Sequence, residues 1–183
     1  IKKKFNRIDV IINNAAITGA SYKKGWNSNF QKQYIHYWSE TFEVNVIAVF
    51  HLSQQFYSLL KKSKNPVIIN MASLYGVYTP DFEIYKNSEL NNPAAYSTSK
   101  AALIYLTKWL SKAMSPKVRV NSISPGGVEN NQSIKFKKQY LKKISLKKMI
   151  TPSDIINLVK FLMSENSIKI TGQNFLVDGG WNG

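Results

Sequence analysis

The sequence predicts an α/β fold in which a parallel sheet lies between two layers of helices. Short apolar runs rich in Val and Ile alternate along the chain with longer segments of helical period. The Val and Ile runs are nearly continuous, which indicates strands buried on both faces, as in a parallel sheet covered by helices. We therefore expect a doubly wound parallel sheet with a three-layer α/β/α architecture.

The expected elements alternate along the chain. The expected strands are residues 8–13, 66–73, 118–124 and 174–180, and the expected helices are residues 38–62, 94–114 and 152–164. Pro152, Ser153 and Asp154 mark a helix start, because proline fits the first helical position and short polar side chains cap free backbone N–H groups. Residues 170–172, Ile-Thr-Gly, lead from this helical segment into the last strand.

Length and composition favour a single globular domain. The chain has 183 residues, of which 44% are hydrophobic, enough for one sizeable core. Its longest apolar run is far shorter than the roughly 20 residues that a membrane span needs, so we expect no membrane partner. The chain has no cysteine, which excludes disulfides and thiolate metal sites and fits a reducing, cytoplasmic location.

The formal net charge of +15 raises the question of nucleic-acid binding. All 25 basic residues are lysines except Arg7 and Arg119. Proteins that read nucleic acids rely on arginine, and the sequence carries no helix-turn-helix, zinc-finger or RNA-binding signature. We therefore expect no nucleic-acid partner.

A tyrosine and a lysine stand four residues apart in "PAAYSTSK", residues 93–100. On a helix, Tyr96 and Lys100 would share one face, with Cβ atoms roughly 5–6 Å apart. A cation within about 4–6 Å favours an ionised phenol and lowers its pKa, ordinarily near 10, by about 1–3 units. Such a tyrosine could exchange protons near neutral pH. Taken alone, the pair also fits an exposed Tyr and Lys on a solvated helix face.

Small and polar residues follow the predicted strands. Asn13 to Ala16 follow the first strand, Ser73 ends the second, and residues 124–127, Ser-Pro-Gly-Gly, end the third. In open α/β sheets, ligands bind in the crevice outside the carboxyl ends of the strands, so these residues are candidate ligand contacts. At any one strand end they also fit an ordinary turn.

Taken together, these residues resemble the short-chain dehydrogenase/reductase family. The matching motifs stand in the family's order: "NNAA" at 13–16, "NV" at 45–46, "NMAS" at 70–73, Tyr96-x-x-x-Lys100, "PGG" at 125–127 and "ITGQNFLVDGG" at 170–180. The resemblance covers roughly residues 5 to 180. It implies a Rossmann-like fold, NAD or NADP as cofactor, and interconversion of a carbonyl and a secondary alcohol.

The resemblance also implies the roles of individual residues. Tyr96 would be the general acid or base, Lys100 would lower its pKa and hold the nicotinamide ribose, Ser73 would hydrogen-bond the substrate oxygen, and Asn45 would anchor a water relay to the lysine. The implied cofactor-binding residues are Asn14, Ala15, Ala16, Asn45, Tyr96, Lys100, Pro125, Gly126 and Val128. Ala16 replaces the commoner glycine, and Asn130 stands where the family often has threonine, which leaves a phosphate contact in doubt.

The family's Gly-rich phosphate turn would lie some 75 residues before "NNAA", outside this sequence. We therefore interpret residues 1–183 as the C-terminal part of a single NAD(P)-binding domain. The N-terminal strands and the residue that discriminates NAD from NADP are expected upstream. On this interpretation the chain alone is expected to bind cofactor weakly and to be inactive.

Two segments bear on the substrate. Residues 74–95 form a long insertion with four aromatic and three acidic residues, which fits a substrate-side loop or a tolerated surface insertion. Residues 132–149 hold seven lysines where the family places a substrate lid; they could attract a phosphorylated substrate or form a solvated surface. Residues 75–87 and 122–132 are similar to a bacterial subgroup associated with sugar modification of flagellin. That similarity favours a nucleotide-linked sugar or sugar acid.

Two other functions remain as alternatives. A nucleotide-sugar epimerase or dehydratase uses a similar Tyr and Lys with retained NAD, although "VDGG" favours the dehydrogenase branch. A non-catalytic nucleotide-binding protein would not need the full residue set.

The family's four-helix interface implies a homodimer or homotetramer through residues 40–62 and 94–113. His36 and His51 lack the spacing of a metal site or catalytic triad, so we expect no metal.

Overall fold

The computed structural model describes residues 4–18, 21, 24–86 and 91–181. Its sheet has four parallel strands in the order β1-β2-β3-β4. They are β1 (Val10–Asn13), β2 (Val67–Met71), β3 (Arg119–Pro125) and β4 (Asn174–Val177). Each lies within, or differs by a residue or so from, a segment that the sequence predicts as a strand. The predicted fold class is confirmed.

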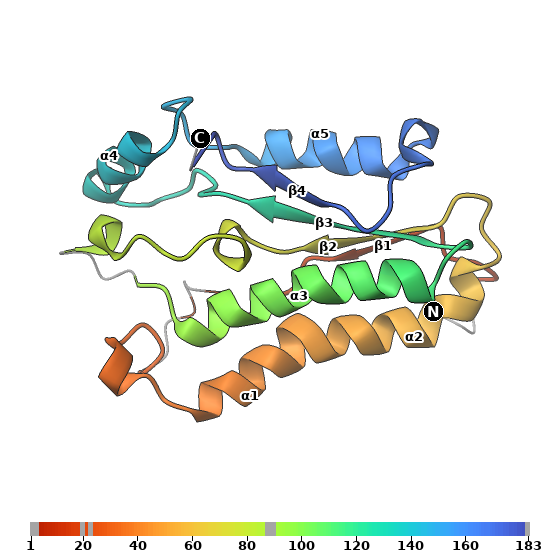
Figure 1. Ribbon diagram of the computed structural model, residues 1–183, viewed down its shortest axis with the longest axis horizontal. Coiled ribbons are helices and arrows are strands. Elements are labelled where there is room, and N and C mark those ends of the chain that lie inside the picture. The colour runs from red at the N-terminus through yellow and green to blue at the C-terminus, as the bar shows by residue number, and fades with distance from the viewer. Residues whose placement is uncertain (1–3, 19–20, 22–23, 87–90, 182–183) are drawn as a thin grey trace.

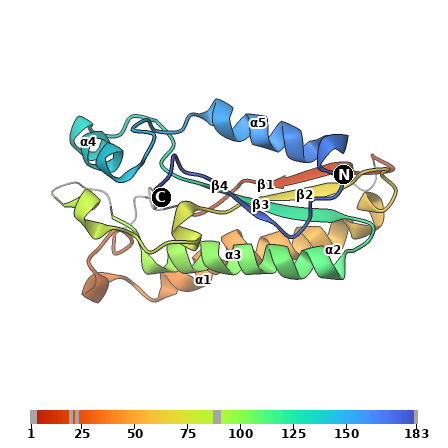
Figure 2. The ribbon, with the colours of Figure 1, turned by 45° about the horizontal axis from the view of Figure 1, so that its top comes forward.

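The helices cover both faces of the sheet (Figure 1). They are α1 (His36–Phe42), α2 (Ala48–Leu60), α3 (Ala94–Ala113), α4 (Ile134–Lys143) and α5 (Pro152–Met163). A π-helical turn, η2 (Glu43–Ile47), joins α1 to α2, so the predicted helix 38–62 is one helix with a local irregularity. Figure 2 shows the three layers, with α5 on one side of the sheet and α1, α2 and α3 on the other.

The central strands are buried from both sides, as their Val and Ile runs predict. Val67, Ile68 and Ile69 have no exposed surface. Because successive strand residues point to opposite faces, Ile68 packs in a cluster with Leu60 and Leu110, and Ile69 packs in a second cluster with Leu162 of α5. None of the described helices is long and apolar enough to cross a membrane.

The start of α5 has the capping predicted from its sequence. Pro152 occupies the first turn, and the Asp154 carboxylate accepts hydrogen bonds from the backbone N–H of Thr151, at 2.7 Å, and from its hydroxyl, at 2.8 Å. A 3₁₀ turn, η5 (Glu165–Ser167), follows α5. Gly172 then turns the chain into β4 with φ of 73°, a conformation that favours glycine.

Arg119 ties the start of β3 to the end of α5. The residue is 9% exposed, and its guanidinium donates to the carbonyl oxygens of Leu162 and Ser167, each at 3.0 Å. It also donates to the Asn65 side chain at 3.1 Å. Helix C-terminal carbonyl groups lack partners within the helix. The guanidinium adds charge-assisted hydrogen bonds to the carbonyls of Leu162 and Ser167, which also accept the Ser167 hydroxyl and the Ile170 N–H respectively.

Candidate functional site

The candidate site lies at the carboxyl edge of the sheet. The register pairs Asn13 of β1 with Asn70 of β2, and Asn70 with Ser122 of β3, so these three strands run toward the same edge. Ser73 follows β2 there, and a 3₁₀ turn, η3 (Leu74–Gly76), begins directly after it. α3 begins beside this turn and brings Tyr96 and Lys100 to the strand ends.

Gly76 allows η3 to approach α3 closely. A Cβ at this position would lie 2.7 Å from the backbone carbonyl carbon of Lys100 and 2.9 Å from the backbone nitrogen of Ala101. Backbone atoms cannot give way as a flexible side chain can, so only glycine fits without a shift of the turn or the helix. This contact sets the position of Ser73 relative to the first turns of α3.

Ser73 and Tyr96 meet at this edge. Ser73 is buried, and its hydroxyl oxygen accepts the backbone N–H of Tyr75 at 3.2 Å. A hydrogen bond between the Ser73 and Tyr96 hydroxyls lowers the pKa of Tyr96, although burial has the larger effect and raises it. Because the Tyr75 N–H occupies an acceptor position of the serine oxygen, the serine proton is free to point to Tyr96.

Lys100 lies one turn further along the same face of α3. Its side chain is 4% exposed, and its Nζ donates to the carbonyl oxygen of Met71 at 2.7 Å. The Nζ lies 5.9 Å from the centre of the Tyr96 ring, so the predicted i,i+4 proximity is present. Burial lowers the pKa of Lys100 from 10.5 to about 8, because the ammonium has lost most of its hydration.

One prediction about Tyr96 and Lys100 is wrong, namely the direction in which the pKa of Tyr96 is shifted. The sequence predicts that Lys100 lowers the pKa of Tyr96, whereas the pKa of Tyr96 is raised by burial. The ammonium makes its hydrogen bond to Met71 rather than to the phenol. The loss of water around the ring therefore outweighs any attraction between the phenolate and this cation.

Asn45 lies in the π-helical turn and is 1% exposed. Its Oδ1 accepts the backbone N–H of Ile17 at 2.9 Å, and its Nδ2 donates to the Ile17 carbonyl at 3.0 Å and to the Ser99 hydroxyl at 2.9 Å. Ser99 in turn donates to the backbone carbonyl of Tyr96 at 2.8 Å. Asn45 thus fixes both the chain after β1 and the first turn of α3. π-Helical turns occur frequently at functional sites.

The predicted cofactor contacts lie at neighbouring strand ends. Asn14 and Ala15 are exposed after β1, and Ala16 is half-buried. Pro125, Gly126 and Val128 are half-buried at and after the end of β3. They lie on both sides of the strand that leads to Ser73, and their contact with a cofactor stays a prediction.

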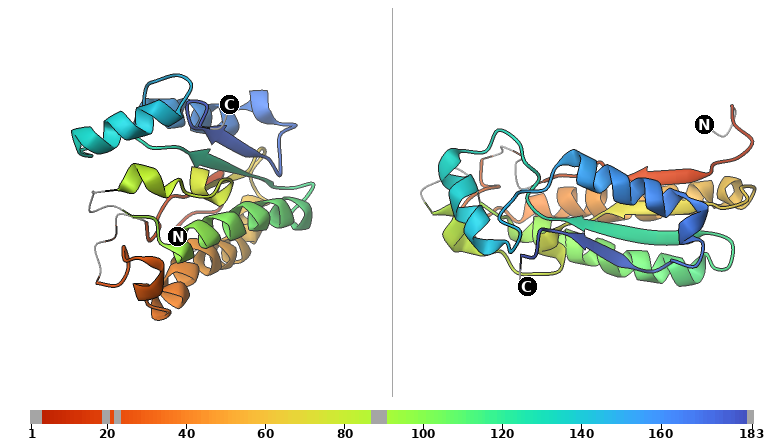
Figure 3. Two further views of the ribbon diagram at one scale, coloured as in Figure 1. Left: turned by 60° about the vertical axis from the view of Figure 1, so that its left-hand side comes forward. Right: turned by 90° about the horizontal axis from the view of Figure 1, so that it is seen from above.

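The segment after η3 packs against α4 in an aromatic cluster that the sequence does not predict. Its buried members are Leu74, Ile84, Phe136, Tyr140, Ile144, Met149 and Trp181, with Tyr75, Tyr78 and Tyr85 packed against them. The Asp81 carboxylate and Lys143 Nζ form an ion pair at 2.7 Å. Figure 3 shows the two segments side by side at one end of the molecule. Residues 87–90 of the insertion lie outside the described residues.

No group of three or more His, Cys, Asp or Glu side chains in the described residues could hold a metal ion. His36 packs its ring 4.1 Å from that of Tyr37 and belongs to an aromatic group with Tyr34. This environment agrees with the interpretation of His36 as an ordinary helix residue.

Comparison with known proteins identifies the class. A family model described as enoyl-(acyl carrier protein) reductase matches residues 1–182. The chain is 32% identical over 180 residues to post-translational flagellin modification protein A of Campylobacter coli, covering 98% of this chain and 69% of that protein. The chain belongs to the short-chain dehydrogenase/reductase family, whose members are NAD(P)-dependent oxidoreductases, and the predicted resemblance and cofactor class are confirmed.

Another curated relative and a solved structure agree with this family assignment. The 3-oxoacyl-acyl-carrier-protein reductase FabG of Thermotoga maritima is 29% identical, with 98% of this chain and 68% of that protein covered. A short-chain dehydrogenase from Leptospira borgpetersenii, crystallised with bound NAD+, has a TM-score of 0.83 and 39% identity, with 94% of this chain and 64% of that chain covered. The chain thus spans about two thirds of the length of the relatives that it matches.

Proposed function

We propose that the protein is a cytoplasmic NAD(P)-dependent oxidoreductase that interconverts a carbonyl and a secondary alcohol. The observation that carries this proposal is the meeting of Ser73, Tyr96 and Lys100 at the carboxyl edge of the sheet. The family's NAD-bound members support the cofactor class.

Tyr96 exchanges the proton on the substrate oxygen. When bound, the nicotinamide cofactor supplies or accepts a hydride, and the charge that develops on the substrate oxygen needs a proton donor and a polar partner. Ser73 is fixed by the N–H of Tyr75 and presents its hydroxyl next to the phenol. The serine orients the substrate oxygen and stabilises its developing charge, and Tyr96 gives or takes the proton.

Lys100 fits a contact with a polyhydroxylated group such as the nicotinamide ribose. An ammonium carries three N–H donors, and the described residues supply one acceptor within hydrogen-bond distance, the carbonyl of Met71. The remaining donors suit ribose hydroxyls. Exposed Asn14 and Ala15, and Pro125, Gly126 and Val128, flank this position at the adjacent strand ends and would contact the rest of the cofactor.

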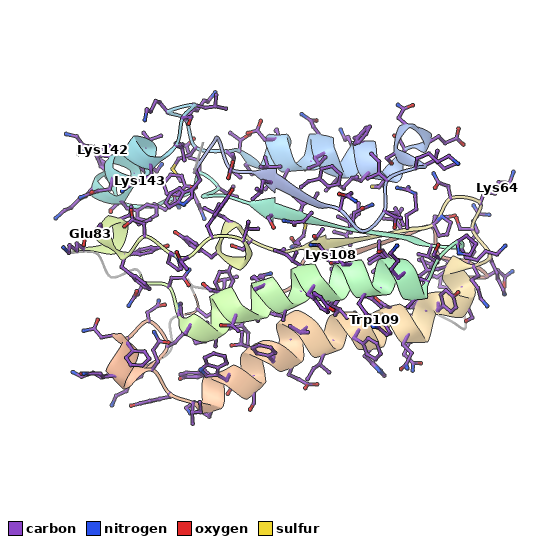
Figure 4. The ribbon with its side chains drawn as sticks, viewed as in Figure 1. Lys64, Glu83, Lys108, Trp109, Lys142 and Lys143 are labelled. Carbon is purple, nitrogen blue, oxygen red and sulfur yellow. The ribbon has the colours of Figure 1, made fainter. Side chains whose placement is uncertain are left out.

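The substrate that we propose is a nucleotide-linked sugar or sugar acid. This proposal rests on the sequence resemblance to a bacterial subgroup associated with sugar modification of flagellin, and one relative is a post-translational flagellin modification protein. Lys142 and Lys143 lie on α4, at the end of the molecule that carries the aromatic cluster (Figure 4). Lys143 is paired with Asp81, whereas Lys135, Lys138 and Lys142 are exposed and could attract a phosphate.

We also propose that the protein self-associates through α2 and α3. The outer face of these helices carries exposed apolar side chains, including Tyr105 at 71% and Trp109 at 52% exposure. The Trp109 ring lies 6.2 Å from that of Phe50 on α2, so the exposed surface is continuous across both helices. Figure 4 shows Trp109 on this outer face. Large exposed aromatic patches of this kind favour protein interfaces.

Tyr96→Phe tests the proposed chemistry in the whole protein. The substitution removes the proton donor and keeps the ring, so we expect turnover of secondary alcohols with NAD+ or NADP+ to fall at least about 100-fold. Cofactor affinity, measured by calorimetric titration, should stay nearly unchanged. Tyr105→Phe, on the outer face of the same helix, is the matched control. Turnover by Tyr96→Phe within about tenfold of wild type would contradict the assignment.

A further inference from the structure

The turn that begins at the end of β3, residues 125–127, packs directly on a tyrosine of α4. A Cβ at Gly126 would lie 2.8 Å from the Tyr140 hydroxyl oxygen, and a Cβ at Gly127 would lie 2.8 Å from the ring carbon that carries this hydroxyl. The backbone N–H of Gly127 also donates a hydrogen bond to the hydroxyl oxygen. The tyrosine thus occupies the space that side chains at both positions would need, and it bonds the backbone of the turn.

Tyr140 is fixed in this position by its surroundings. The residue is 2% exposed, and its ring centre lies 4.9 Å from that of Trp181 and 5.8 Å from that of Phe136. Burial raises the pKa of the Tyr140 phenol above its ordinary value, so the hydroxyl is uncharged at physiological pH. Tyr140 therefore presents a preorganised, neutral acceptor to the turn.

The backbone N–H groups of this turn are used within the protein. Pro125 carries no N–H. The N–H of Gly126 donates to the carbonyl of Val177 at 2.8 Å, and the N–H of Gly127 is taken by Tyr140. A pyrophosphate is held by free backbone N–H groups or by cations, and the turn offers neither. In the proposed function the turn therefore suits the nicotinamide end of the cofactor, which must lie next to the reacting substrate carbon.

We propose that Tyr140 is a positioning residue that holds this turn in the conformation that receives the nicotinamide end of the cofactor. The inference rests on the proposed oxidoreductase function. Tyr140 acts through the backbone of Gly127, whereas Ser73 and Tyr96 act on the substrate oxygen. The Tyr140 hydroxyl should therefore influence the binding of the nicotinamide end and leave the binding of the adenosine diphosphate part unchanged.

Tyr140→Phe tests this role, because it keeps the ring and removes the acceptor of the Gly127 N–H. The whole protein is titrated calorimetrically with NAD+ and with ADP-ribose, the fragment that lacks nicotinamide, or with NADP+ and ADP-ribose 2′-phosphate. Loss of one hydrogen bond that preorganises the turn predicts a Kd for the complete cofactor about 3–10-fold above that of wild type, with the Kd of the fragment unchanged. Tyr78→Phe, which removes a hydroxyl packed against the same aromatic cluster, should change neither Kd.

Amide hydrogen exchange without ligand reports on the same contact independently of the cofactor. In Tyr140→Phe the N–H of Gly127 loses its acceptor and should exchange at least about tenfold faster. The N–H of Gly126, bonded to Val177, should exchange at the wild-type rate. A general loosening of the fold would raise both exchange rates and weaken the cofactor and the fragment together, so the two comparisons separate positioning from destabilisation.

An unchanged Kd for the complete cofactor in Tyr140→Phe, or an equal loss of affinity for cofactor and fragment, would overturn the inference and leave the proposed function in place. Unchanged exchange of the Gly127 N–H would also overturn it, because the hydrogen bond would then not hold the turn. If the wild-type protein binds neither NAD+ nor NADP+, the proposed function itself fails, and the inference fails with it.

Discussion

Lys100→Met removes a buried ammonium and keeps an unbranched side chain of similar length. Lys100 is 4% exposed as a residue, and its ammonium has one described acceptor, the carbonyl of Met71. Its pKa is about 8 in the folded protein, against 10.5 for a solvated lysine. The folded state thus binds this proton less tightly than the unfolded state, so the charged lysine lowers the free energy of unfolding.

These two pKa values determine whether the free energy of unfolding rises or falls with pH, and over which pH range it changes. Below pH 8 both states are protonated and the full destabilisation is present. Between pH 8 and 10.5 the unfolded chain holds more protons than the folded protein, so stability rises with pH in this window. A shift of this size corresponds to about 3 kcal/mol, of which about 2 kcal/mol should be recovered between pH 7 and about pH 9.5.

The assay is urea denaturation of wild type and Lys100→Met, without cofactor, at several pH values in this range. The quantity of interest is how their difference in unfolding free energy changes with pH, because titration of the tyrosines contributes to both proteins and cancels. The advantage of Lys100→Met at pH 7 should shrink by about 2 kcal/mol at about pH 9.5. Lys108→Met, at an exposed position of the same helix (Figure 4), should show no such change. A difference that stays constant with pH would refute the assignment of a desolvated ammonium.

Two further substitutions test the surface of α3 and the anchor of α5. Trp109→Glu places a charge in the exposed aromatic patch and should shift sedimentation toward monomer. Leu146→Glu, at another exposed apolar site, should leave sedimentation unchanged. An unchanged oligomer in Trp109→Glu would place the interface elsewhere. Arg119→Met should lower the free energy of unfolding by about 2–4 kcal/mol, because it removes the charge-assisted hydrogen bonds of a buried guanidinium to the carbonyls of Leu162 and Ser167. Arg7→Met, at an exposed arginine, should change it by less than about 0.5 kcal/mol, and equal losses in both variants would contradict this account.

The sequence predicts the elements whose signals are local. Continuous Val and Ile runs mark β2 and β3, and both are buried on each face. Pro152 and Asp154 predict the start of α5 to within a residue. The i,i+4 spacing predicts the proximity of Tyr96 and Lys100. These inferences need only periodicity, capping and the polarity of a parallel sheet.

The features that the sequence does not reveal depend on contacts between distant residues. α4 carries Phe136 and Tyr140 four residues apart on one face, but that spacing does not reveal that the insertion is what packs on them. The raised pKa of Tyr96 depends on how much water surrounds the ring, which spacing alone does not determine.

The first turns of α3 are fixed from two sides, by the Asn45 side chain and by close packing of Gly76, and this explains how a desolvated ammonium can be kept at the site. On one side, Asn45 joins Ser99 to the backbone of Ile17. On the other, Gly76 packs directly on the backbone of Lys100. Tyr96 and Lys100 therefore keep their positions without an attraction between their own side chains. The fold can tolerate an ammonium that lowers its stability, because the surrounding contacts and not the charge hold the geometry. The poorly hydrated ammonium keeps N–H donors that can bind a polyhydroxylated ligand.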